Sequence, residues 1–469
     1  MSNRKEEESA SASLPPAAKT VITQIYRLIR AGRAGEALPR LAELEDLGRG
    51  NTVILNETEG AILIDIGSGI GSVDLVNRGI SLLSANEVGK FPEASQCAHW
   101  YNLGNAHSAL CYAEKTPTGT LRALDLNFKL AKQYYRSAMA LISGSPQTMA
   151  RLYTNYGILL RTVGRQVEEI EAYDEALNAV PDFAMALWHK ARGLRWYSQL
   201  VERPTKGSSL LEAWELLKKA LERGLDPGHQ AKAREELAEL ERILKEPKAP
   251  PHKHTEHIAD SDTEANYIKF CLENRLYLHP CPVHAHEAYQ DPMSVRLPTS
   301  AKDEFLELRS DDLALIKQEY IAARFLLFSY RLQQPDLSFV DRGTYLPSLR
   351  EGSGQIYIQL LILSFRAAFA ILDKIAFFLN KFCKLGEKED RIYFREELFL
   401  ADKVLRRAFA KYDGPQLAAL FDLACEFSKD QPLYPLRDLR RKLVLAWINS
   451  RIFKSLKSKG DLQPVTDAN

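Results

Sequence analysis

The sequence of 469 residues lacks net charge, paired cysteines and a long uninterrupted apolar run. Its 62 basic residues balance 61 acidic ones, so the chain as a whole has no field that would steer it to nucleic acid or to an anionic membrane. Six scattered cysteines indicate free thiols and a cytoplasmic location rather than a disulfide framework. The N-terminal residues lack the apolar core of a signal peptide. These absences favour a soluble protein whose basic surface is local.

The most apolar segment, residues 356–380, is interrupted by Arg366, Asp373 and Lys374. A charge near the centre of a membrane helix costs about 2.5–3.5 kcal/mol. We therefore expect a buried helix here and no membrane partner. Isolated charges on such a helix are usually paired. As an alternative, Arg366 and Asp373 are candidates for lining a binding cleft.

Between residues 17 and 245 the sequence repeats a helix-turn-helix pattern. Its clearest copy, YTNYGILLRTVGRQVEEIEAYDEALNAVP (Tyr153 to Pro181), resembles the tetratricopeptide repeat, whose period is roughly 34 residues. In this copy the small Gly157 lets the paired helix approach, and Tyr173 packs from that second helix. The resemblance implies an all-α fold, a right-handed superhelix and a protein or peptide partner.

Weaker copies flank the clearest one. The copy that begins at Trp100 places Gly104 and Tyr135 in the same positions, and another runs from Leu187 to Ala220. The first helix pair, residues 17–47, has the apolar spacing without the signature residues, as terminal capping units usually do.

A glycine-rich segment, AILIDIGSGIGSVD at residues 61–74, matches the loop with which methyltransferases bind S-adenosylmethionine. There, Gly67, Gly69 and Gly71 would let the ligand approach the backbone ahead of a helix N-terminus. That fold needs several more strands, however, and the downstream sequence has the pattern of helix pairs. We therefore predict a repeat helix, with Gly67 and Ile70 in its seam, and no cofactor.

The segment HPCPVHAH at residues 279–286 gathers four candidate zinc ligands, His279, Cys281, His284 and His286. Structural zinc sites usually join two separated ligand pairs, which one tight cluster does not provide. We interpret the segment as a polar loop stiffened by prolines and predict no metal site. Zinc on Cys281 and His284 is the alternative.

The Pro-rich, charged segment EPKAPPHKH after residue 245 is the best candidate for a domain boundary. We expect a tail at 1–16, a repeat domain at 17–245, a linker at 246–258, a helical bundle at 259–457 and a second tail at 458–469. Within the bundle, apolar spacing predicts helices at 311–331, with Ser310 as N-cap, and at 355–382, 391–411, 415–428 and 434–457.

Four segments of the second half resemble a bacterial branch of the HEPN superfamily in which the domain follows a tetratricopeptide array. They are YIKFCLENRLYLHP, IKQEYIAARFLLFSY, FRAAFAILDKIAFFLN and LYPLRDLRRKLVLAW, spread over residues 260–457. The resemblance implies a helical domain that forms a homodimer. Many HEPN proteins are metal-independent RNases, and their motif is an arginine followed after four to six residues by a histidine.

The chain departs from that motif, because no histidine follows His286. Counting from Arg440 places Leu445 at the histidine position, and counting from Arg441 leads toward Trp447. Neither side chain can transfer a proton near neutral pH as histidine does. We therefore predict a binding domain without catalytic residues. An active RNase that takes its base from elsewhere is the alternative.

A local excess of positive charge lies near the C-terminus. Residues 431–459 contain eight basic side chains and a single acidic one, Asp438. Such a stretch suits contacts with RNA phosphates, and the alternative is a solvated helix that packs its apolar face inward. The residues that we assign to RNA contact are Arg437, Arg440, Arg441 and Lys442.

Overall fold

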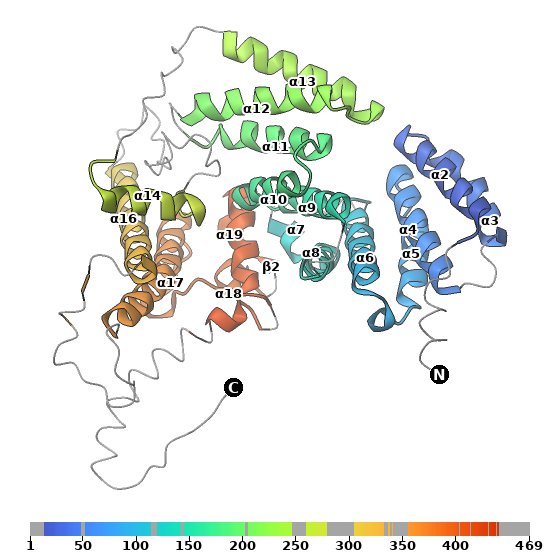
Figure 1. Cartoon of the computed structure of the whole chain (residues 1–469). Coiled ribbons are helices and arrows are strands. Elements are labelled where there is room, and N and C mark those ends of the chain that lie inside the picture. The colour runs from blue at the N-terminus through green and yellow to red at the C-terminus, as the bar shows by residue number, and fades with distance from the viewer. Residues whose placement is uncertain are drawn as a thin grey trace. The chain divides into compact units, whose positions relative to one another are not determined.

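In the part of the chain that the computed structural model describes, the fold is all-α apart from one short hairpin, which confirms the predicted fold class (Figure 1). The chain forms two compact units, one mainly from residues up to 245 and one mainly from residue 259 onward. None of the described helices is both long and apolar enough to cross a membrane. The structure describes residues 14–47, 52–113, 120–141, 145–201, 205–245, 259–278, 304–332, 336–337, 340, 355–402, 404–412, 414–429, 431–437 and 439.

The first unit is a series of helices that follow one another in pairs (Figure 1). The pairs are α2 (Pro16–Arg30) with α3 (Leu38–Leu47), α4 (Thr52–Ile70) with α5 (Val73–Ser84), α6 (Glu93–Ala113) with α8 (Leu126–Met139), α9 (Pro146–Arg161) with α10 (Gln166–Ala179), and α11 (Ala184–Tyr197) with α12 (Thr205–Glu222). Helix α13 (Pro227–Lys245) follows the last pair. Three short helices lie between the longer ones: the 3-10 helices η1 (Ala34–Ala37) and η2 (Val88–Lys90), and α7 (Thr120–Leu124).

Within two of the pairs, a glycine of the first helix faces a tyrosine of the second. A Cβ atom on Gly157 would lie 2.5 Å from the Tyr173 ring, and one on Gly104 would lie 2.5 Å from the Tyr135 ring. Both distances are far below van der Waals contact, so any larger residue would push the helices apart. The packing of small against large residues predicted from the sequence is therefore present in both pairs.

The glycine-rich segment is helical, as expected for a helix pair. It forms the end of α4, a turn at Gly71 with φ of +71°, and the start of α5. A Cβ atom on Gly67 would lie 2.8 Å from the Val76 side chain, so this glycine lies in the seam. The prediction for Ile70 was wrong: it is the last residue of α4 and is 45% exposed.

Buried apolar side chains form a row of clusters along the first unit rather than one central core. One cluster joins α2, α3 and α4, the next joins α4, α5 and α6, and another joins α10 to α13. Each cluster is shared by neighbouring helix pairs, so each pair is stabilised by contact with the next.

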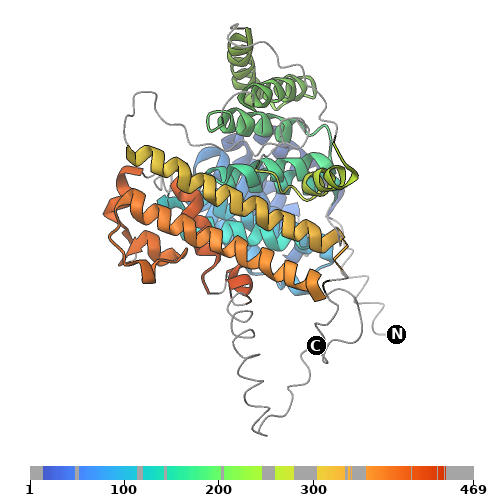
Figure 2. The same ribbon diagram turned by 90° about the vertical axis from the view of Figure 1, so that its left-hand side faces the viewer.

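The second unit is dominated by α16 (Glu304–Leu332) and α17 (Gln355–Cys383), which pack side by side (Figure 2). Helix α14 (Asp262–Glu273) contacts α16. Of α19 (Pro415–Glu426), the residues from Leu420 onward belong to this unit. The helices predicted at 355–382 and 415–428 are confirmed. Ser310 is not an N-cap, because α16 begins six residues earlier and Ser310 lies inside it; the preceding EFLEL is itself a good helix former.

The helix predicted at 391–411 was wrong. That stretch contains η5 (Glu389–Arg391), α18 (Glu396–Phe399), the paired strands β1 (Leu400–Ala401) and β2 (Val404–Leu405), and η6 (Arg407–Tyr412). Between the strands, Asp402 has φ of +50°. The Arg406 side chain donates to the carbonyl oxygens of Leu400 at 3.2 Å and Glu397 at 3.0 Å, and these bonds hold the chain in a turn rather than a helix.

A buried arginine joins α14 to α16. Arg324 is 5% exposed; its guanidinium donates to the Leu276 carbonyl oxygen at 2.9 Å and to the Tyr267 hydroxyl at 2.8 Å. The same group lies 4.6 Å from the ring centroid of Tyr277 and 5.6 Å from that of Tyr320. The segment after α14 is therefore fixed to α16 by both hydrogen bonds and cation–π contacts.

Candidate functional site

The first helices of successive pairs present aligned stripes of polar and aromatic side chains. On α6 the stripe contains Tyr101, Asn105 and Tyr112, and on α9 it contains Asn155 and Ile158, in both cases at spacings of three, four or seven residues that share a helix face. Tyr101 contacts the Asn155 side chain and Tyr112 contacts the backbone carbonyl of Ile158, so the contacts follow in the same order along both helices.

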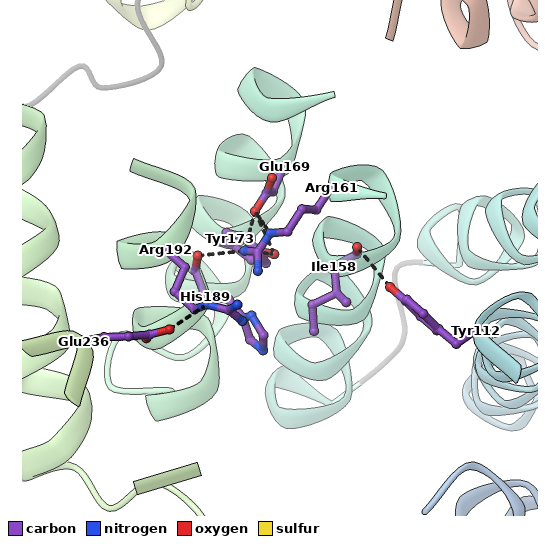
Figure 3. A network of polar contacts seen from close by, with 8 residues as sticks. All are labelled: Tyr112, Ile158, Arg161, Glu169, Tyr173, His189, Arg192 and Glu236. Atoms are coloured by element: carbon purple, nitrogen blue, oxygen red, sulfur yellow. Dashed lines mark hydrogen bonds and ion pairs between the residues drawn. The ribbon is translucent and has the colours of Figure 1, made fainter. Parts of the chain in front are cut away.

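Hydrogen bonds connect these stripes. The Asn155 amide nitrogen donates to the Tyr101 hydroxyl at 3.1 Å and to Asn105 Oδ1 at 2.9 Å. From α8, the buried Tyr135 hydroxyl donates to the same Asn105 oxygen at 2.9 Å. Tyr112, which is 47% exposed, donates to the Ile158 carbonyl oxygen at 3.5 Å (Figure 3). The two asparagine side chains are thus held in fixed orientations.

A carboxyl group on α4 lies near the same stripes. Burial raises the pKa of Asp65 to about 6, although the charge of Arg151 and a hydrogen bond with Tyr26 both lower it. Burial also raises the pKa of Tyr26, and the Asp65 charge adds to that shift. Asp65 therefore changes its charge within the physiological pH range.

Replacing Asp65 with asparagine is expected to make the folded state less sensitive to alkaline pH. Because the folded-state pKa of Asp65 lies above its unfolded value, its contribution favours folding below about pH 4 and is lost as the pH rises through 6. The free energy of unfolding of Asp65→Asn, relative to that of wild type, should therefore rise by about 2 kcal/mol from pH 4 to pH 8. Urea unfolding at both pH values measures this difference. An equal difference between Asp65→Asn and wild type at both pH values would contradict it, and the exposed Asp226→Asn serves as control.

A second polar network lies between α9, α10 and α11 (Figure 3). Arg161 donates to Glu169 Oε1 at 2.6 Å, to the Tyr173 hydroxyl at 3.1 Å and to the His189 carbonyl oxygen at 3.1 Å. Glu169 is only 1% exposed, and its burial raises its pKa against the opposing charge of Arg161. One guanidinium therefore joins three helices and neutralises a buried carboxylate.

His189 lies beside this network. Its ring stacks on Tyr173 at 5.9 Å, and burial together with the Arg161 charge holds its pKa well below the usual range. Within the described residues, neither His189 Nδ1 nor Glu169 Oε2 has a hydrogen-bond partner. His189 is therefore neutral, and Arg161 donates to its backbone carbonyl. This arrangement stabilises the packing of α9, α10 and α11.

The network continues to α13 through Glu236. This carboxylate pairs with Arg192 at 3.2 Å (Figure 3). It also accepts from the Trp188 indole nitrogen at 2.8 Å. The Arg192 guanidinium also lies 5.2 Å from the Trp188 ring centroid. These contacts join α11 to α13 and give Arg192 a structural partner in Glu236.

Sequence reasoning did not single out these residues. Any exposed helix has polar side chains along one face. The spacing of Tyr101, Asn105 and Tyr112 therefore does not separate a binding site from an ordinary solvent-exposed face. The spacing of Asn155 and Ile158 on α9 is three residues and does not repeat the spacings of four and seven residues on α6, so no periodic signal was available. Only the structure shows that the two asparagines contact each other.

The candidate RNA contacts lie at the end of the described chain. Arg437 is exposed and donates to the Phe427 carbonyl oxygen at 3.3 Å. Arg440, Arg441 and Lys442 lie outside the described residues, as does the cluster at 279–286. Residues 434–437 are helical, which agrees with the start of the helix predicted there.

The structure does not bring Arg366 and Asp373 together by any hydrogen bond among the described residues. Asp373 accepts from the Phe394 backbone nitrogen at 3.2 Å, and Lys374 pairs with Glu319 of α16. Both charges thus have the structural partners expected of isolated charges on an apolar helix. Arg366 is half-buried, and its Nε lacks a partner in the described part of the chain.

Comparison with protein families finds a match in the second half of the chain. Residues 313–448 match the family of LA2681-like HEPN domains, which supports a HEPN-superfamily domain in this part of the chain. The match includes α17 and all of the candidate RNA contacts, and it leaves the helix pairs of the first unit outside. No curated protein matches the chain.

Proposed function

We propose that the protein is a non-enzymatic sensor or adaptor. In this proposal the helix pairs are tetratricopeptide-like repeats that bind a protein or peptide partner, and the HEPN domain forms a homodimer and holds RNA without cutting it. The observation that carries the proposal is the row of tyrosine and asparagine side chains on α6 and α9, which mutual hydrogen bonds hold in place. Fixed aromatic and amide groups suit recognition, because little side-chain entropy is lost on binding.

Two features of the HEPN domain support binding rather than cleavage. The basic stretch at 431–459 supplies cations for phosphate contacts, and part of it lies within the family match. The same stretch lacks the histidine that the proton transfer of RNA cleavage uses, since none follows His286.

The full-length protein is therefore expected to bind single-stranded RNA without cleaving it. Changing both Arg440 and Arg441 to alanine should weaken binding and reduce the slope of log affinity against log salt by about 1.4, because two phosphate contacts are lost. Gel-shift titrations over a range of salt, with product analysis on denaturing gels, measure both quantities.

A matched control removes the same charge from exposed helix positions elsewhere. The double variant Arg27→Ala and Arg234→Ala lies on α2 and α13 and should leave the salt slope unchanged. Cleavage that is specific and disappears in the Arg440, Arg441 variant would instead identify the protein as an active HEPN-type RNase effector, and the binding proposal would fail.

A further inference from the structure

His189 of α11 has a ring nitrogen that reaches solvent and that no described residue uses. The residue is 7% exposed, and its Nδ1 is buried without a hydrogen-bond partner in the described chain. Its Nε2 also has no hydrogen bond to a described residue, but this atom is not fully buried. The tautomer with its proton on Nε2 avoids a buried N–H without a partner. His189 therefore directs one unused N–H outward from a buried ring.

Basic groups from three helices surround this imidazole. Burial is the main cause that lowers the pKa of His189, and four basic side chains lower it further. They are Arg161 on α9, Arg192 on α11, and His229 and Lys232 on α13. Positive charges that disfavour a protonated histidine favour an anion at the same place.

Two of these basic side chains are compensated by carboxylates, and two are not. Arg161 and Arg192 each form an ion pair, with Glu169 and Glu236 respectively, so these charges largely cancel. The side chains of the two basic residues on α13, by contrast, form no hydrogen bond or ion pair with any described residue. The lysine of this pair is exposed and the histidine is half-buried, so both can turn toward a ligand. Uncompensated positive charge therefore remains beside the imidazole of α11.

One indole ring holds the two histidines close together. Trp188 is 3% exposed, and its ring centroid lies 4.8 Å from those of both His189 and His229. The indole nitrogen donates to Glu236, which fixes the ring. Lys232 follows His229 by three residues on α13, so their side chains share a face of that helix. His229 lies in the first turn of α13, where the helix dipole favours an anion.

We propose that His189, His229 and Lys232 bind a phosphate group, either of free phosphate or of a small phosphomonoester. A phosphate group carries up to two negative charges and at least three acceptor oxygens, so it can accept from donors on different helices. A carboxylate has one charge and two oxygens in one plane, so it matches three separate donors less well. This site gives the helix pairs a small-molecule ligand in addition to the protein or peptide partner proposed above.

The test titrates inorganic phosphate and ribose 5-phosphate into the full-length chain by calorimetry at low salt. Lys232→Gln should weaken binding at least about tenfold, because it removes one charged donor. Its melting temperature without ligand should equal that of wild type, since the side chain is exposed and has no described partner. The control Lys19→Gln changes an exposed lysine of α2 in the same way and should bind within about twofold of wild type.

The two probes also distinguish the source of the phosphate group. Tighter binding of inorganic phosphate identifies free phosphate as the ligand, whereas equal or tighter binding of ribose 5-phosphate identifies a phosphomonoester. If neither probe binds, or if Lys232→Gln binds as wild type does, the inference is overturned. Acetate that competes as well as phosphate would overturn it too, because the site would then take any small anion. None of these results bears on the RNA binding proposed for the HEPN domain.

Discussion

Replacing Arg161 with methionine is expected to destabilise the first unit by about 3–5 kcal/mol, because it removes the only ion-pair partner described for the buried Glu169. Methionine keeps much of the side-chain volume, so the loss reports charge and hydrogen bonds rather than a cavity. The bonds to the Tyr173 hydroxyl and the His189 carbonyl oxygen are lost as well. Urea unfolding, together with hydrogen exchange over α9 to α11, measures the effect.

A second substitution tests whether the lost stability comes from the unpaired carboxylate of Glu169 or from disrupted packing. With Glu169→Gln added, no buried carboxylate remains unpaired, and most of the lost stability should return. The cost of Arg161→Met should also shrink below about pH 4, where Glu169 is protonated in the folded and unfolded states alike. As control, Arg40→Met breaks the exposed pair with Glu43 and should cost less than about 1 kcal/mol. A double variant no more stable than Arg161→Met would contradict the mechanism.

The helix pairs could be predicted from the sequence because their packing rule is local. A glycine in one helix and a tyrosine about one helix later are enough to predict the contact of Gly157 with Tyr173 and of Gly104 with Tyr135. The seam of α4 followed the same rule as far as Gly67. It failed at Ile70, since apolar spacing alone does not show where a helix ends.

The hairpin at 400–405 could not be predicted in this way. Leu398, Phe399 and Phe409 are buried, and their spacing also fits a helix. What decides between the two structures is Arg406, whose side chain satisfies backbone carbonyl groups of the turn. Hydrogen bonds from one side chain to the carbonyl groups of a nearby turn leave no periodic signal in the sequence.

The candidate binding residues could be predicted even less. Asn105 and Asn155 are separated by 50 residues and become meaningful only as a hydrogen-bonded pair. By contrast, the basic stretch near the C-terminus is contiguous and needs no fold to be noticed. Candidate sites built across helices therefore require the structure, whereas a candidate site along one segment can be proposed from the sequence alone.

In the second unit, replacing Arg324 with lysine is expected to cost about 3 kcal/mol even though the charge is kept. The guanidinium donates to Leu276 and Tyr267 in different directions while lying beside the Tyr277 ring, and a single ammonium group cannot reproduce this geometry. Each lost charged hydrogen bond in a buried site costs about 1.5–3 kcal/mol, and the cation–π contacts add to this.

The effect of Arg324→Lys should be local. Hydrogen exchange should increase in α14 and α16, where the lost bonds lie, and remain unchanged in α9 to α11. The exposed Arg331→Lys on the same helix should change stability by less than about 0.5 kcal/mol. Because Tyr320 also donates to the Leu276 carbonyl oxygen at 2.7 Å, that carbonyl keeps one partner in the lysine variant. A cost as small as that of Arg331→Lys would therefore mean that this tyrosine, and not Arg324, holds the segment after α14 against α16.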